Sequence, residues 1–184
     1  GGFASAISSD GSTVAGYVNT PSGSDFIIWT NRVPTAYPMP LGYSDNTYFS
    51  ISGDGKSVAG TGYHYFDGFA WIWTQQGGQR IVPDISANEP IYGAGPISTD
   101  GRTLALNSLY GTRRVAPNGF YLGGTGPTGG GNAYLWTEAG GFQSIGHLTN
   151  DPKEIISITA LSGDASTAAG QARRCSVCSG SGYP

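Results

Sequence analysis

Short apolar stretches alternate with polar, glycine-rich turns along the chain, and one such unit occurs four times. It reads ISSDGSTVAG at residues 7–16, and near copies follow as ISGDGKSVAG at 51–60, ISTDGRTLAL at 97–106 and LSGDASTAAG at 161–170. Small and β-branched residues on both sides of an Asp-Gly pair are typical of two paired strands joined by a tight turn. Each copy therefore predicts a β-hairpin whose two turn residues adopt the positive φ of a mirror-image turn.

The fourth copy departs from this pattern at its turn. Ala165 stands where the other three copies have glycine. A side chain disfavours positive φ, so we expect either a strained turn here or a turn of another type.

A second apolar pattern follows each hairpin. The stretches FIIWT, WIWT and YLWT end at Thr30, Thr74 and Thr137, and the last two run on into QQGGQRIV and EAGGFQSI. These continuations predict a third strand, a Gly-Gly turn and a fourth strand. One repeat is thus expected to form four short strands.

The spacing of the repeats identifies an architecture. Tryptophan follows the turn aspartate by 19 residues in the first two copies and by 36 in the third, which carries 17 extra residues. A four-stranded unit that recurs about every 45 residues has the size of a β-propeller blade. We expect a single all-β, propeller-like domain with blades at roughly 4–49, 50–94 and 95–157 and an incomplete fourth blade at 158–184.

Taken together, the two patterns resemble those of a known family. The pairing of ISxDGxxVAG with AxxWTxxGGxxxI resembles the HAF-type extracellular repeats of bacterial secreted and surface proteins, and its first half is similar to the SPDGxxIAF blades of TolB-like propellers. The resemblance implies a secreted, propeller-like protein. It carries over no catalytic residue, because the shared positions are turn and packing positions.

Composition excludes several partners. Charged residues make up 11% of the 184 residues, the net charge is −3, and only two of the nine basic residues are lysines. Without a basic stripe, nucleic acid and anionic lipid are poor partners. The apolar runs are too short to cross a membrane as helices. The opening GGFASAIS has no signal-peptide layout, so we expect that a signal has been removed or that the sequence is a fragment.

Binding is expected on the face that carries the variable loops. In antiparallel blades the Asp-Gly and Gly-Gly turns share one end, and the loops of variable sequence share the other. Aromatic and basic residues gather in these loops, and the predicted binding residues for a protein or a glycan are Tyr63, His64, Tyr65, Phe66, Arg113 and Arg114. The alternative is that the loops are tolerated insertions whose rings only cap the end of a blade.

Enzyme and metal motifs find little support. The glycines of GTGPTG at 124–129 match a dinucleotide-binding pattern, but a predicted strand follows them and not a helix. His64 and His147 lie in different repeats without zinc-binding spacing. We therefore predict no cofactor and no metal, and we assign the turn aspartates to hydrogen bonds in their own turns and the recurring tryptophans to packing between blades.

Cys175 and Cys178 are the only two cysteines. In an exported protein this CxxC spacing favours a disulfide that closes a small loop, and bonds between subunits are the alternative.

The function predicted from the sequence is that of a secreted, non-enzymatic interaction or structural module. One alternative is a subunit of an extracellular filament, in which the unpaired edge formed by Ala168, Ala169, Gly170 and Gln171 contacts the GGFAS start of a neighbouring chain. A competing explanation for that edge is a longer protein whose later blades close the ring. Another alternative is a carbohydrate-binding or glycoside-cleaving propeller, for which paired carboxylates such as Asp67 and Glu89 are the candidates.

Overall fold

The chain folds into four antiparallel β-sheets. A computed structural model describes residues 2–21, 23–38, 45–64, 67–86, 91–108, 132–151 and 154–174. Within these ranges lie fourteen strands: β1 Gly2–Ile7, β2 Thr13–Thr20, β3 Gly23–Thr30, β4 Val33–Tyr37, β5 Asp45–Ile51, β6 Ser57–His64, β7 Asp67–Thr74, β8 Gly78–Ile81, β9 Ile91–Ile97, β10 Leu104–Ser108, β11 Ala133–Thr137, β12 Gly141–Ser144, β13 Glu154–Leu161 and β14 Ala168–Arg174.

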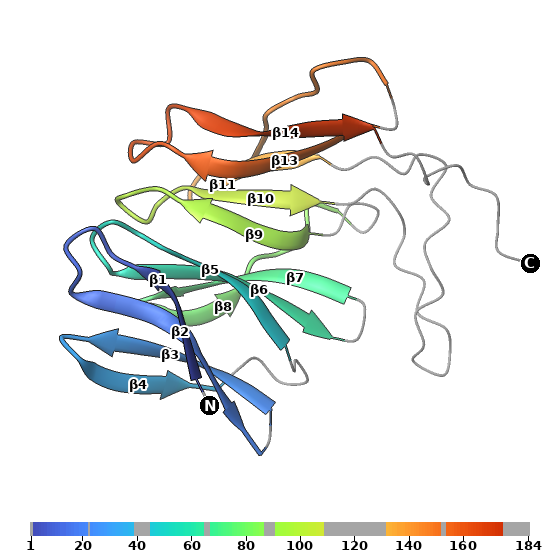
Figure 1. The fold of residues 1–184 in the computed structure, drawn as a ribbon. Coiled ribbons are helices and arrows are strands. Elements are labelled where there is room, and N and C mark those ends of the chain that lie inside the picture. The colour runs from blue at the N-terminus through green and yellow to red at the C-terminus, as the bar shows by residue number, and fades with distance from the viewer. Residues whose placement is uncertain are drawn as a thin grey trace, which may run out of the picture.

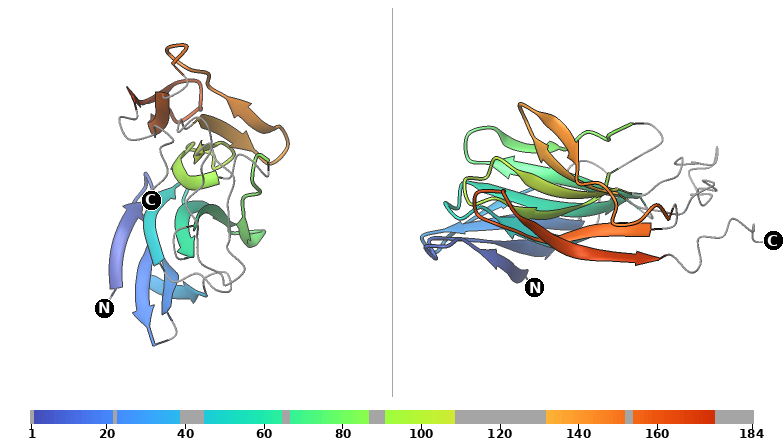
Figure 2. Two further views of the ribbon diagram at one scale, coloured as in Figure 1. Left: turned by 90° about the vertical axis from the view of Figure 1, so that its right-hand side faces the viewer. Right: turned by 90° about the horizontal axis from the view of Figure 1, so that it is seen from above.

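The sheets are the blades of an open, partial propeller. Strands β1 to β4, β5 to β8 and β9 to β12 form three complete four-stranded blades in sequence order, and β13 pairs with β14 in a two-stranded fourth. Figure 1 shows the blades stacked in sequence order, and the end-on view in Figure 2 shows them following one another along an arc. The predicted fold class is therefore confirmed. All extensive contacts between strands lie within one blade or between successive blades.

The three Asp-Gly turns and the Asp-Ala turn of the fourth copy have one geometry, which differs from the predicted one. In the first turn the Gly11 N–H donates to the Ser8 carbonyl at 3.0 Å, and Gly11 has a φ of 72°. Asp10 is not among the described residues with positive φ, so the mirror-image turn is wrong. The physical reason is the aspartate side chain, whose Oδ1 accepts from the Ser12 N–H at 2.9 Å and from the Ser8 hydroxyl at 2.7 Å.

A mirror-image turn does occur elsewhere in the first blade. Between β3 and β4, Asn31 and Arg32 have φ values of 50° and 70°, and Thr30 pairs directly with Val33. Two positive φ values across a two-residue loop are the signature of this hairpin type. In the second and third blades the same connection uses the predicted Gly-Gly turns, with Gly78 and Gly141 both at a φ of 68°.

Apolar side chains from successive blades meet in the spaces between the sheets. Trp71 and Trp73 of β7 pack on Phe26 and Ile28 of the first blade, with the Trp71 and Phe26 rings 4.9 Å apart. Trp136 joins the next cluster together with Ile72 of the second blade. Tryptophan packing between blades is therefore confirmed for Trp73 and Trp136, which are each 7% exposed.

The first tryptophan of the series has a different environment. Trp29 is half-buried. The second and third blades each pack on the blade before them, but no described segment packs on the corresponding side of the first blade. A residue in repeat register is therefore buried only where the preceding blade is present.

The fourth turn keeps the common geometry with alanine in place of glycine. Ala165 has a φ of 60°, and Asp164 makes the usual bonds to Ser162 and Ser166. Of the two outcomes expected for this turn, the strained one is therefore the one observed.

Replacing Ala165 by glycine should stabilise the fourth blade by about 1 kcal/mol, because glycine adopts this φ without steric cost. The reverse change, Gly11→Ala, should destabilise the first turn by a similar amount, since a Cβ there meets nothing within 4 Å and only the backbone is strained. Gly101→Ala should cost more, because its Cβ would lie 2.4 Å from the Ser57 hydroxyl oxygen. Denaturant unfolding and amide exchange of β13 and β14 measure these effects. A neutral or destabilising Ala165→Gly would contradict the strain.

Acid should unfold the protein through these turns. Hydrogen bonds from the Ser12 backbone and from Ser8 lower the pKa of Asp10 from 3.8 to about 2, and bonds from Ser162 and Ser166 lower the pKa of Asp164 to the same value. A carboxyl with a lowered folded pKa stabilises the fold above its unfolded pKa, and this contribution is lost as the pH falls through the folded value. The free energy of unfolding should therefore fall between about pH 4 and pH 2. The double variant Asp10→Asn/Asp164→Asn should flatten that pH dependence, and an unchanged slope would contradict the assignment.

Candidate functional site

Successive Asp-Gly turns are hydrogen-bonded to one another. The Ser9 N–H donates to the Gly53 carbonyl at 3.1 Å, the Asp54 N–H to the Thr99 carbonyl at 3.3 Å, and the Thr99 N–H to the Gly163 carbonyl at 2.8 Å. These bonds connect all four blades at one end of the molecule, seen as the tight loops on the left of Figure 1. They hold the backbone of successive turns in place relative to one another.

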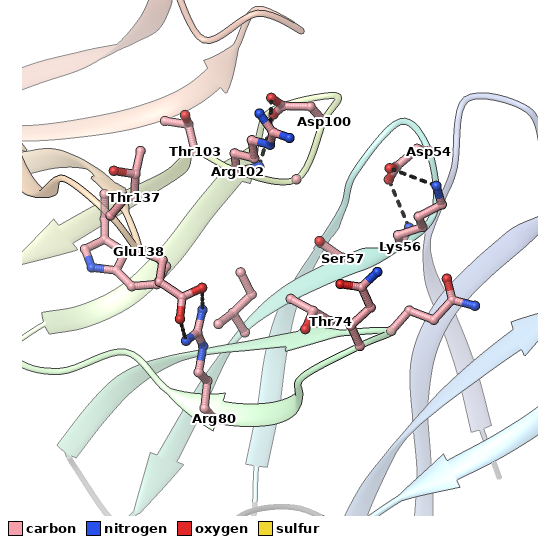
Figure 3. Close-up of a pocket in the computed structure, with 16 residues that line it drawn as sticks. Asp54, Lys56, Ser57, Thr74, Arg80, Asp100, Arg102, Thr103, Thr137 and Glu138 are labelled. Atoms are coloured by element: carbon pink, nitrogen blue, oxygen red, sulfur yellow. Dashed lines mark hydrogen bonds and ion pairs between the residues drawn. The ribbon is translucent and has the colours of Figure 1, made fainter.

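A cleft opens between the second and third blades at this end. It has a volume of about 700 Å³ and is lined by the Asp-Gly turns of both blades, by Gln75 and Gln76 of the turn before β8, and by Thr137 to Ala139 after β11. Figure 3 shows the side chains around an open centre. The Asp-Gly and Gly-Gly turns thus share one end of the propeller, as the strand parity predicts.

An ion pair crosses the cleft from blade to blade. Arg80 of β8 forms a two-pronged contact with Glu138, in which Nη2 donates to Oε2 at 2.7 Å and Nη1 donates to Oε1. The guanidinium also lies 5.6 Å from the ring centre of Trp136. The hydrogen bond lowers the pKa of the Glu138 carboxyl and raises the pKa of Arg80. This contact holds one wall of the cleft.

Two further cations line the cleft, one from each blade, and have weaker partners. Lys56 Nζ is 4.0 Å from Asp54, Arg102 Nε is 3.9 Å from Asp100, and their side chains are 66% and 86% exposed. Oδ1 of each aspartate is used inside its turn, accepting the backbone N–H of the cation two residues later at 3.0 Å. A hydrogen bond from Ser98 is the main cause that lowers the pKa of Asp100. Both cations are therefore available to an incoming anion.

The remaining lining groups are hydroxyls and amides. Thr74, Thr103 and Thr137 contribute hydroxyl groups, and Gln75 and Gln76 contribute carboxamides. Such a surface can donate and accept hydrogen bonds along an extended polar ligand. Within the described ranges there is no group of three or more His, Cys, Asp or Glu side chains that could hold a metal ion. The described ranges also contain no helix of the length and hydropathy that a membrane span requires.

Of the six residues that the sequence predicts for binding, the structure places the backbone of two, and these two lie away from the cleft. Tyr63 and His64 are the last two residues of β6, at the end of the second blade away from its Asp-Gly turn, where His64 pairs with Asp67. Tyr65, Phe66, Arg113 and Arg114 fall outside the described residues. The side chains of Tyr63 and His64 are not described either, so the binding role of all six residues stays a prediction.

The other predicted sites fall at the end of the chain. Cys175 and Cys178 lie outside the described residues, so their disulfide stays a prediction. Ala168, Ala169, Gly170 and Gln171 open strand β14, are exposed, and pair on one side with β13. Among the described strands none pairs with the other edge of β14, and a contact between subunits at this edge is still untested.

The cleft itself is not apparent from the sequence pattern. Its main ion pair joins residues 58 positions apart, and both occupy variable positions of the second repeated pattern. One signal was present, since a basic residue follows Asp-Gly directly in the second and third copies only, as Lys56 and Arg102. These are the two blades that border the cleft.

Comparison with known proteins identifies the fold. A TolB-type protein of Agrobacterium tumefaciens matches 96% of the chain with a TM-score of 0.58 at 14% identity. The tricorn protease matches 84% of the chain with a TM-score of 0.53 at 13% identity, and a prolyl endopeptidase matches 87% with a TM-score of 0.52 at 12% identity. These similarities establish a β-propeller fold like that of TolB-type proteins.

Sequence comparison does not assign the chain to a family. No family model matches the chain, and no curated protein matches its sequence. The chain spans 60% of the length of the TolB-type structure, 13% of the tricorn protease and 23% of the prolyl endopeptidase. The HAF-type resemblance therefore remains an expectation from the sequence.

The ion pair across the cleft should contribute little by its charge and more by its packing. Exposed pairs of this kind contribute little to stability, and salt weakens them. Arg80→Ala should destabilise the protein more than Glu138→Ala, because it also removes the cover from Trp136. Denaturant unfolding of both single variants and the double variant, at low and high salt, measures the coupling. Equal losses without coupling would contradict the observed geometry.

Proposed function

We propose that this protein is a non-enzymatic, extracellular interaction module, and that the cleft between its second and third blades binds an extended, carboxylate-bearing segment of a partner. The observation that carries the proposal is the pair of exposed cations, Lys56 and Arg102, on neighbouring turns above a wall of hydroxyls and amides. Carboxylates are common to acidic protein segments and to acidic glycans, so both sources present the same chemistry.

The distribution of hydrogen bonds supports binding at this place. Asp54 and Asp100 are held in their turns, where each accepts a serine hydroxyl at 2.6 Å and 2.7 Å respectively. Their second oxygens are near the outer limit of an ion pair with the cations. A ligand carboxylate can replace this weak contact with a direct hydrogen bond from Lys56 or Arg102. Hydrogen bonds between successive turns hold the backbone from which both cations extend.

The extracellular location is part of the same proposal. It rests on the resemblance of the repeats to secreted and surface proteins, together with a fold that occurs in TolB-type proteins. A filament subunit is kept as the second candidate, and the exposed edge of β14 favours it.

The double variant Lys56→Ala/Arg102→Ala should weaken binding to acidic peptides or acidic polysaccharides by at least about tenfold, a loss of about 1.4 kcal/mol. The change removes both cations and leaves the turn hydrogen bonds to the backbone N–H groups in place. Binding to immobilised poly-glutamate and to a uronic-acid polysaccharide, measured separately, identifies which source carries the carboxylate.

Arg173→Ala/Arg174→Ala is the matched control, because it removes the same charge from the exposed strand β14, far along the chain from the cleft. It should leave binding unchanged. Equal loss in both double variants would reduce the effect to net charge and would overturn the cleft as the site, as would binding that neither double variant affects.

A further inference from the structure

Each complete blade has a front side, which faces the preceding blade, and a back side, which faces the next. The front side of a blade presents the same five strand positions in each case, matched through the strand pairing. In the second blade these are Phe49, Ile51, Val58, Trp71 and Trp73, and in the third they are Ala94, Ile97, Leu104, Tyr134 and Trp136. All ten pack in the clusters between blades.

The first blade has the same front side without a cover. Its five positions are Ala4, Ile7, Val14, Ile27 and Trp29. Ile7 is 62% exposed, whereas its counterpart Ile97 in the third blade is 7% exposed. A hollow of about 530 Å³ lies over this side, and among the described residues no other blade borders it. The first blade therefore presents a docking surface that two other blades of the same chain use for docking.

The turn glycines add a specific fit to this surface. A Cβ on Gly55 would lie 2.6 Å from the Thr13 hydroxyl oxygen, and one on Gly101 would lie 2.4 Å from that of Ser57. The turn of each blade is thus pressed against the preceding hairpin. Gly11, the counterpart in the first blade, has nothing within 4 Å of this position. Among the described residues, no hairpin packs against it.

The fourth blade offers the matching back side. Ala15, Ala59 and Ala105 lie at one position on the back of the first three blades, and each is 0% exposed under the blade that follows. Their counterpart Ala169 is exposed. Thr167 occupies the place of Thr13 in the hairpin against which the next turn glycine packs, and it is also exposed.

We propose that the front side of the first blade binds the back side of the fourth blade of a second copy. In this head-to-tail contact Gly11 meets the hairpin around Thr167, while Ile7, Val14 and Trp29 cover Ala169. The interface continues the packing that already joins the blades of one chain, so it needs no new recognition chemistry. Because two different surfaces meet, the contact is heterologous and can be repeated from copy to copy. It uses the faces of the terminal blades and does not depend on the cleft or on pairing at the β14 edge.

The test uses variants that block one side each. Ile7→Asp places a charge on the front side, and Ala169→Asp places one on the back side. The parent chain should associate as its concentration rises in sedimentation equilibrium, and each variant alone should associate at least about tenfold more weakly, since a carboxylate would be buried without a partner. An equimolar mixture of the two variants should form dimers, because the intact front of one binds the intact back of the other.

Val33→Asp is the matched control, since Val33 lies in the same blade, is 65% exposed and is not part of the front side. It should associate like the parent chain. Circular dichroism of every variant checks the fold, and Val14→Lys serves as a second front-side variant. A parent chain that stays monomeric at all soluble concentrations would overturn the proposal. So would a mixture of the two variants that fails to dimerise, which would indicate a symmetric interface.

Discussion

The hydrogen-bonded Ser-Asp-Gly turn is the constraint on which the rest of the structure depends. The Ser8 hydroxyl donates to Asp10 and accepts from the Thr13 N–H at 3.0 Å, so one short loop satisfies its own polar groups. The glycine that follows the aspartate makes room for a neighbouring hairpin at Gly55 and Gly101. The same loop therefore closes a hairpin and sets the separation of two blades. Because each repeat needs both properties, its sequence can vary little at the turn. This explains why the ten-residue unit recurs.

The polar groups that stabilise the turns are different from those that are exposed for binding. The aspartates, which are the obvious charged groups of the repeat, are used within the loop that carries them. The basic residues that follow in two of the copies are exposed at the cleft. Proteins as different as a TolB-type protein, the tricorn protease and a prolyl endopeptidase contain this fold, so the fold alone does not decide what a given chain does. The side chains at the edges of the scaffold carry that information.

Sequence reasoning predicted the local part of this architecture and missed what depends on distant residues. The four-strand unit, the shared end of the turns and the burial of Trp73 follow from spacing alone. The partial exposure of Trp29 does not, because the repeat pattern assumes a preceding blade that the described residues do not contain. The turn type was wrong because the aspartate side chain accepts hydrogen bonds from its own turn. The pair of Arg80 and Glu138 was missed because it joins two blades through variable positions of the repeat. The cleft forms only where two blades meet, so the sequence of a single blade does not predict it.

Because contacts are restricted to successive blades, they also determine how cooperatively the molecule unfolds. A chain built of nearest-neighbour units behaves as a one-dimensional array, in which each interface couples the unfolding of two units. The second and third blades are held from both sides, whereas the two-stranded fourth blade is coupled through β13 and the strands of the third. Thermal fluctuations should therefore open the array from its ends inward. The same independence lets such a gene gain or lose one repeat by duplication or deletion without redesign of the blades that remain.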